Sequence, residues 1–302
     1  MGDTHWRVPQ GLGLGNAAKK ISDGIVEELW FGDDDLQVAQ ADAAESFAAA
    51  MAKVRGLTPF PAIAQRIMQM AQDPDVQLEK VSQAMTKDPA LAAKTLRLAT
   101  SALFRVGVDC DTVDQAVVRL GMNTMYQMIS ATGVLGLFKE SGKVGAGIRD
   151  HCVGVAAISR TMAQKTGWAG GGQVFLAGLM RDVGKLLVMQ TEEFDYTRVP
   201  EDDEGWDRVH LNERERLGCD HGVLGGHVMT MWKMPLFVTK IVAWHHQPAW
   251  AYEEGGDIGL MVAAIRIADR LDTQIAKSPI LDEKFLDEAA ADAACGYMNV
   301  RA

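Results

Sequence analysis

Cysteines, aromatic residues and positive charge are all scarce in this chain. Its four cysteines lie far apart and none forms a CxxC spacing, so neither a zinc ribbon nor a redox pair is indicated. Such unpatterned cysteines fit a reducing cytoplasm, which is the expected location. Aromatic residues make up only 7% of the chain. A composition rich in Ala, Leu and Met favours helices over β-sandwiches.

The charge and hydropathy patterns argue against two further classes of protein. The formal net charge is −10 and the basic residues are scattered, so nucleic acid is not an expected partner. The longest uncharged run, 122–138, is interrupted by polar residues and indicates a buried helix, with no membrane span. Residues 1–15 lack the apolar stretch of a secretory signal. With no alternating strand pattern anywhere, the sequence predicts an all-α fold.

Helical spacing of apolar residues divides the chain into three parts. We expect an N-terminal extension over 1–55, with helices near 17–31 and 40–54, a helical subdomain over 56–142, and a second helical subdomain over 143–302 that includes the C-terminal helices. In the middle part, helices are predicted after Pro61, from residue 76, after Asp88-Pro89, and on either side of a break at Gly121.

The glycine-rich stretch 141–147 is predicted to be a linker. After it, the apolar spacing predicts helices over 148–166, 173–190, 220–232, 236–246 and 257–275, followed by a helical last thirty residues. The acidic, poorly periodic stretch 191–212 is expected to form a surface loop.

Histidines and two carboxylates are the candidate functional groups. The second half holds six of the seven histidines: His151, His210, His221, His227, His245 and His246. Asp182 and Asp269 each lie in an apolar helical segment, where an ionised carboxylate needs a metal or a cation as partner. His245 and His246 are neighbours on a predicted helix and should point about 100° apart, so at most one should face a shared site.

Several ordered motifs resemble those of HDOD domains. They are Phe60-Pro-Ala-Ile-Ala, Asp73-Pro-Asp, Asp88-Pro-Ala-Leu-Ala-Ala-Lys-Thr-Leu-Arg-Leu-Ala-Thr-Ser-Ala and Thr112-Val-Asp-Gln-Ala-Val-Val-Arg-Leu-Gly. The family typically shows "DPALxxxLLRLANSA" and "S-[IL]-x-x-A-[IV]-x-x-L-G" at the last two. The resemblance implies an HDOD-type helical bundle joined to a second half, about 148–275, like that of the HD superfamily. It also implies a component of bacterial signalling.

The resemblance also implies where a metal site would lie. The HD superfamily binds metal through one His, a His-Asp pair and a distal Asp, which correspond to His151, Arg181-Asp182 and Asp269. The family's "HDIGK" is Arg181-Asp-Val-Gly-Lys185 here. The related HD-GYP enzymes have further histidines for additional metals, and His221 and His245 or His246 resemble these. The loop signature of HD-GYP enzymes does not follow His246.

Arginine at position 181 departs from the HD pattern. A guanidinium offers no lone pair to a metal and stays cationic, so it would repel a divalent ion. It could instead replace that ion by pairing with Asp182 or Asp269. Three interpretations stay open. One is a vestigial site without a cofactor, made of His151, Arg181, Asp182, Lys185 and Asp269. Another is a surviving Mn, Fe, Ni or Mg site, made of His151, Asp182, His221, His245, His246 and Asp269. The third is a pocket that binds an anion or a nucleotide at Arg181 and Lys185.

The function expected from this pattern is a non-catalytic regulatory module of bacterial signal transduction that binds signalling proteins or a small ligand. The alternative is a metal-dependent phosphohydrolase acting on nucleotides or cyclic dinucleotides. A third hypothesis is a sensor that binds a small anion in the degenerate cavity without turnover.

Overall fold

The chain folds into helices wherever its structure can be described. The computed structural model describes residue 52 and residues 60–70, 73, 75–101, 110–139, 141–191, 193–199, 208–278, 283–290 and 292–298. Within these ranges there is no strand, which confirms the all-α prediction. None of the helices in them is both long and apolar enough to span a membrane. The helices predicted at 17–31 and 40–54 lie outside the described residues, apart from position 52.

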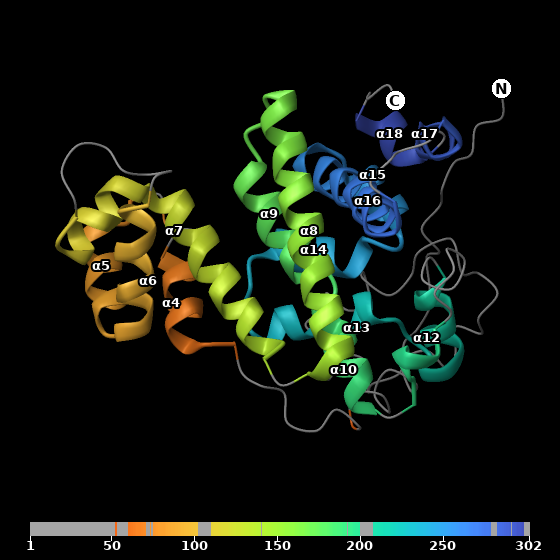
Figure 1. Cartoon of the computed structure of the whole chain (residues 1–302), viewed down its shortest axis with the longest axis horizontal. Coiled ribbons are helices and arrows are strands. Elements are labelled where there is room, and N and C mark those ends of the chain that lie inside the picture. Colours follow the sequence, from red (N-terminus) through yellow and green to blue (C-terminus); the bar gives the residue numbers. More distant parts are fainter. Residues whose placement is uncertain are drawn as a thin grey trace.

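Four helices form the first lobe, at the left of Figure 1. They are α4 (Ala62–Met70), α5 (Leu78–Thr86), α6 (Pro89–Ala99) and α7 (Val113–Leu137). The start of α6 follows the predicted signal, because Asp88 accepts hydrogen bonds from the Ala90 and Leu91 amides while Pro89 occupies the first turn. Helices α4, α5 and α6 all pack against α7, which makes α7 the centre of this lobe.

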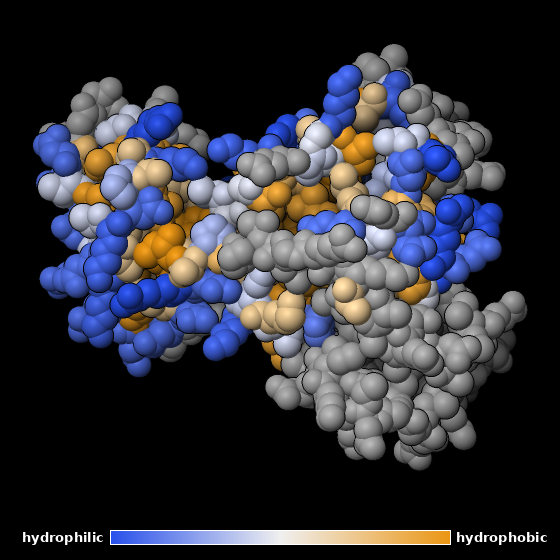
Figure 2. Space-filling model, turned by 90° about the horizontal axis from the view of Figure 1, so that it is seen from below, coloured by the Kyte–Doolittle hydropathy of each residue, from blue (hydrophilic) through white to orange (hydrophobic). Residues whose placement is uncertain are grey.

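The predicted break at Gly121 is present inside α7. Gly121 has φ +69° and ψ 166°, a left-handed backbone conformation that favours glycine. Two helical stretches therefore meet at this residue, and the second leads toward the other lobe, where α7 packs on α9 (Gly171–Met180). In Figure 2 the outer edge of the first lobe is mostly hydrophilic, and apolar residues reach the surface between its helices.

The second lobe contains the other described helices, at the centre and right of Figure 1. Besides α9 they are α8 (Gly142–Thr166), α10 (Val183–Thr191), α12 (Val209–Leu217), α13 (His221–Met231), α14 (Leu236–Trp244), α15 (Pro248–Glu254), α16 (Gly256–Lys277), α17 (Glu283–Ala290) and α18 (Ala293–Met298). Helix α8 packs along both α9 and α16, and α13 packs against α10 and α14. These contacts bring the histidine-bearing helices together.

The predicted linker over 141–147 was wrong. Helix α8 begins at Gly142, which has the positive φ that glycine tolerates. Gly145 and Ile148 in the first turns of this helix are buried. The predicted single helix over 173–190 is interrupted at Arg181-Asp182, where α9 ends and α10 begins. Asp182 therefore lies in a turn between two helices, where its side chain is fully buried. The subdomain boundary near residue 142 stays a prediction.

Two other segments also differ from expectation. The stretch 191–212, predicted as a surface loop, contains a 3₁₀ turn over Tyr196–Arg198 and the start of α12, and Tyr196 and Val209 are buried. The predicted helix over 236–246 ends at Trp244, and the separate helix α15 was missed. Pro248 at the first turn of α15 is a helix-start signal that explains this division.

The junction of α10 with α13 depends on one glycine. A Cβ atom at Gly184 would overlap the backbone carbonyl oxygen of His221, and it would also lie 2.9 Å from the Gly225 amide nitrogen. Only a residue without a side chain allows the two backbones to approach this closely. Because Asp182 precedes α10 and His221 begins α13, the same contact sets the distance between two candidate site residues.

We therefore expect Gly184→Ala to destabilise the protein by at least about 1–3 kcal/mol, since neither backbone can move without disturbing a helix. The matched control is Gly136→Ala in α7, where an added Cβ meets nothing within 4 Å and the change should be neutral or slightly stabilising. Urea unfolding of both variants measures the difference. Equal stability of the two would mean that the α10–α13 contact is not tight.

Candidate functional site

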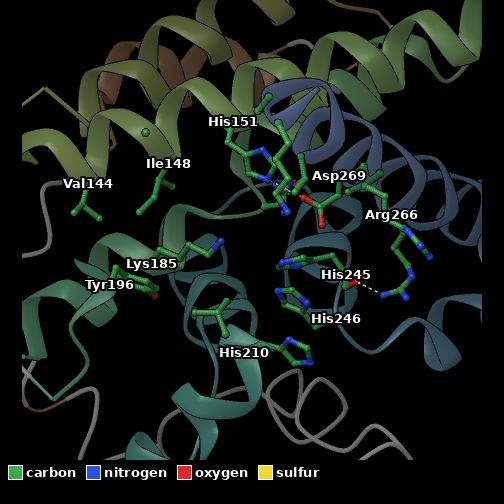
Figure 3. Close-up of a pocket in the computed structure, with 18 of the residues that line it drawn as sticks. Val144, Ile148, His151, Lys185, Tyr196, His210, His245, His246, Arg266 and Asp269 are labelled. Atoms are coloured by element: carbon green, nitrogen blue, oxygen red, sulfur yellow. Dashed lines mark hydrogen bonds and ion pairs between the residues drawn. The ribbon is translucent and has the colours of Figure 1, made fainter. Parts of the chain in front are cut away.

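A cavity of about 750 Å³ lies between α8 and α16 in the second lobe. Helices α10 and α12 and the residues that follow α14 supply further walls, and Figure 3 shows the side chains that point into it. Its lining includes most of the predicted site residues and several that were not predicted. The polar residues that line it are Lys143, His151, Arg181, Lys185, Tyr196, His210, His245, His246, Arg266, Asp269, Arg270, Thr273, Lys277 and Asp292.

Arg181 is a deeply buried charged group of this site, with a side chain that is 1% exposed. Its Nη2 atom lies 3.0 Å from Asp182 Oδ2 and 2.8 Å from Asp269 Oδ1. Burial alone would lower the pKa of Arg181, but the two carboxylates raise it above its usual value, so the guanidinium stays charged. It thus lies between the two carboxylates that the HD resemblance assigns to a metal ion.

His151 of α8 completes this group. Its Nε2 lies 2.8 Å from Asp269 Oδ1, and its Nδ1 lies 2.6 Å from Asp272 Oδ2. Burial and the nearby Arg181 lower the pKa of His151, but hydrogen bonds to the two carboxylates outweigh them and raise it. The ring is therefore fixed between two acids of α16. Asp272 was missed by the sequence analysis, although it lies one helical turn beyond Asp269.

Asp182 connects this group to the histidines. Arg181 contacts Oδ2 of its carboxylate, while Lys185 Nζ and His221 Nε2 lie 3.2 Å and 3.1 Å from Oδ1. Burial would raise the pKa of Asp182, but Arg181 and then Lys185 hold it well below its usual range. Asp182 is therefore an ionised carboxylate within a buried site, and the chain itself surrounds it with positive charge.

His221 is oriented by Glu213, a residue that the sequence analysis missed. Glu213 Oε2 lies 2.6 Å from His221 Nδ1 and also accepts the His221 backbone amide at 2.8 Å. The Tyr196 hydroxyl donates to Glu213 Oε1 at 2.5 Å. Burial lowers the pKa of His221, but the Glu213 carboxylate and a hydrogen bond to Asp182 raise it to about 9. The His221 ring thus carries a proton on each nitrogen.

His245 and His246 both reach the same place, so the expectation that at most one would do so was wrong. Helix α14 ends at Trp244, and the two rings, 4.0 Å apart between centroids, follow the helix end. His245 Nδ1 donates to the Val242 carbonyl at 2.7 Å, which leaves Nε2 as the acceptor, 3.7 Å from Asp182 Oδ1. His246 Nε2 lies 3.0 Å from His221 Nε2.

The two remaining histidines of this half differ in position. His210 of α12 stacks on His246 with ring centroids 4.2 Å apart, and burial lowers its pKa to about 4. It therefore adds a neutral ring to the cavity wall. His227 lies farther along α13 and is not among the residues that line the cavity.

The donor set of Asp182, His221, His245 and His246 fits a transition metal. One ligand atom from each of these four residues lies within 4.8 Å of the ligand atoms of the other three. Among the described residues, no other group of histidines, cysteines and acids is arranged in this way. The measured separations of 3.0, 3.1 and 3.7 Å are close to the edge of about 3.3 Å expected for four ligands at about 2.0–2.1 Å from a zinc-like ion. Three imidazoles and a carboxylate suit Mn, Fe, Ni or Zn.

Two observations oppose a metal ion at the predicted site. Asp269 Oδ1 already contacts both His151 and Arg181, and neither His151 nor Asp269 belongs to the group of four. Lys185 Nζ contacts the same Asp182 oxygen that would face an ion at His221. The surroundings of Asp182 are thus divided into an arginine-filled half and a histidine half.

The all-helical fold, with its histidines and acids around one cavity, defines an HD-type helical domain. The HDOD domain pattern matches residues 57–248. The chain therefore belongs to the HDOD domain family.

Solved structures with the same fold come from several bacteria. An HDOD domain protein of unknown function from Geobacter sulfurreducens superposes with a TM-score of 0.68 at 24% identity, over 84% of this chain and 87% of that one. A protein provisionally named a phosphohydrolase, from Shewanella amazonensis SB2B, gives 0.61 at 24% identity, over 84% and 89%. A protein provisionally named a signal transduction protein, from Marinobacter aquaeolei VT8, gives 0.60 at 20% identity, over 88% and 64%. These likenesses show the fold.

One curated relative is similar in sequence. An uncharacterized protein of Treponema pallidum (strain Nichols) is 20% identical over 212 residues, which make up 67% of this chain. The match spans 40% of the length of that relative.

Removing the central cation should be costly. We expect Arg181→Met to lower the free energy of unfolding by about 3–5 kcal/mol, because it leaves the buried carboxylate of Asp182 and the partly exposed carboxylate of Asp269 without their shared cation. Arg149→Met on α8 is the control, since Arg149 is 37% exposed and, among the described residues, its ion pair is with its neighbour Asp150. Denaturant unfolding in the presence of a chelator gives both values, and an unchanged Arg181→Met protein would contradict this role.

The raised pKa of His221 predicts a pH dependence. With a pKa of 6.5 in the unfolded chain and about 9 in the fold, protonated His221 stabilises the protein fully below about pH 6.5. This contribution is lost as the pH rises from about 6.5 to about 9. Unfolding midpoints measured with chelator across this range should fall, and they should fall less in Glu213→Gln. Parallel curves for the two proteins would refute the assignment to Glu213 and His221.

Proposed function

We propose that this HDOD protein is a non-catalytic module of bacterial signal transduction, in which Arg181 takes the place of a catalytic metal ion. The observation that carries the proposal is the buried guanidinium that forms ion pairs with both Asp182 and Asp269. The module would act by binding signalling proteins or a small ligand, and not by turnover. The provisional name of the Marinobacter protein, a signal transduction protein, is in keeping with this proposal.

The chemistry of arginine explains why hydrolysis is not expected at this position. A metal ion promotes hydrolysis by polarising a phosphoryl oxygen and by lowering the pKa of a bound water. A guanidinium supplies positive charge, but it coordinates no water and stays protonated at working pH. Arg181 therefore keeps the two carboxylates paired while the Lewis acid function is lost.

A metal-dependent phosphohydrolase is the second candidate, because one group of donors still suits an ion. Asp182, His221, His245 and His246 would hold it, and it would supply a Lewis acid and an activated water. Within the chain, Glu213 and the Val242 carbonyl fix the ring nitrogens of His221 and His245 so that their Nε2 atoms face Asp182. The Shewanella protein, provisionally named a phosphohydrolase, has the same fold.

Metal content and hydrolysis separate the two candidates. We expect the native protein, purified without chelator from metal-replete medium, to carry well below one equivalent of transition metal and to leave bis(p-nitrophenyl) phosphate intact in the presence of Mn²⁺. Arg181→His restores a lone pair at the HD position and should bind Mn²⁺ or Ni²⁺ more tightly than the native chain in calorimetric titration.

The controls make either outcome informative. About one equivalent of metal in the native protein, with hydrolysis abolished by Asp182→Ala, would reject the non-catalytic proposal. If Arg181→His binds metal no more tightly than the native chain, the arginine is not the reason why the site lacks a metal, and this part of the proposal is rejected.

A further inference from the structure

The cavity is positively charged within an acidic protein. Its lining includes six cationic side chains and two carboxylates, whereas the whole chain has a formal net charge of −10. The cations are Lys143, Arg181, Lys185, Arg266, Arg270 and Lys277, and the carboxylates are Asp269 and Asp292. Burial lowers the pKa of His210, His245 and His246, so these three rings are uncharged at neutral pH. Low-dielectric walls focus such a field and attract anions.

The positive charge has two separate parts. Arg181 and Lys185 lie at the base of the cavity, where Asp182 neutralises them in part. Arg266 and Arg270 are four residues apart on α16, so they extend from the same face of that helix. Lys143, at the start of α8, lines the same cavity from another element. The second part is thus made of residues that do not belong to the metal-type group.

One carboxylate serves both arginines of α16. Asp292 Oδ2 lies 3.2 Å from Arg270 Nη1 and 3.8 Å from Arg266 Nη2. Its other oxygen accepts the backbone amide of Ala294 at 2.8 Å, at the start of α18. Arg266 also donates to the His245 carbonyl, but its buried Nε has no hydrogen-bond partner among the described residues. Two guanidinium forks therefore share a single, partly exposed acid.

We propose that this cavity binds a phosphate-bearing small molecule, whose phosphate contacts Arg266 and Arg270 in competition with Asp292. A phosphate offers several oxygens around a tetrahedral centre, so it can be bonded by two guanidinium forks at once, and Lys143 adds positive charge to the same cavity. A single carboxylate such as Asp292 cannot use all these donors. The cavity volume of about 750 Å³ lies within the range of small-molecule sites and accepts a ligand of nucleotide size.

The competition connects the cavity to the end of the chain. Asp292 lies between α17 and α18, and α18 packs on α16. Tyr297 of α18 lies against Gly259 and stacks on Tyr252 with ring centroids 4.6 Å apart. A phosphate that takes Arg270 removes the ion pair that holds Asp292, and so weakens the attachment of α18. The inference deepens the proposed function, on which it rests, by naming the chemistry of the ligand.

Calorimetric titration of the full chain in EDTA at low salt tests the proposal, because the chelator removes any binding through a metal. The probes are pyrophosphate, ribose phosphate and adenosine monophosphate. Arg270→Gln should weaken binding at least about tenfold, as expected for the loss of a charge-assisted hydrogen bond. Asp292→Asn should tighten it several-fold, since asparagine can still cap α18 but no longer competes as an anion. Arg149→Gln, outside the cavity, should change nothing.

Each outcome decides the proposal. Absence of binding by all three probes, or binding that neither Arg270→Gln nor Asp292→Asn alters, would overturn it. If Arg270→Gln does not fold, the direction of the Asp292→Asn change decides alone. Binding of the nucleotide only would identify a base as part of the ligand, and equal binding of all three would identify the phosphate group alone. Because these measurements involve neither metal nor hydrolysis, a failure here leaves the test of catalysis unaffected.

Discussion

The second lobe depends on a single buried cation placed between two carboxylates. Asp182 comes from the turn between α9 and α10, and Asp269 comes from α16, so the Arg181 guanidinium holds separate elements against each other. His151 extends the contact to α8 through Asp269. An unpaired charge at such depth costs several kcal/mol, so the packing of these helices and the charge of their side chains cannot change independently.

The histidine half of the site follows from the same requirement for charge balance. Arg181, Lys185 and the doubly protonated His221 surround the Asp182 carboxylate. A metal ion among His221, His245 and Asp182 must displace the proton of His221 and remain close to the Lys185 ammonium. The four side chains thus have a geometry that suits a metal ion, but the positive charges around them oppose one. Which of these two effects is larger decides whether the site binds a metal.

Local signals predicted much of the fold, and long-range contacts account for what was missed. Asp88-Pro89 and Gly121 act within one turn of helix, so their effects can be deduced from neighbouring residues. Glu213 lies in a charged run that resembles a solvent-exposed helix, but it is buried and contacts His221, eight residues away, and Tyr196. His245 and His246 both reach Asp182 and His221 because α14 ends at Trp244, and the sequence predicted that this helix continues to residue 246. A pairing of Arg181 with Asp182 or Asp269 was one of the alternatives that the sequence left open, because an acid in an apolar segment requires a metal or a cation as partner.

A cationic side chain such as that of Arg181 is always present in the folded protein, whereas a bound metal ion is present only when the ion is available. A site held together by a bound ion is stabilised in proportion to the logarithm of the free ion concentration, so its integrity rises and falls with the metal content of the cell. Arg181 is present in every copy of the protein at constant stoichiometry, whatever the state of metal starvation or excess. The charge balance of Asp182 and Asp269 therefore does not depend on the metal supply of the cell.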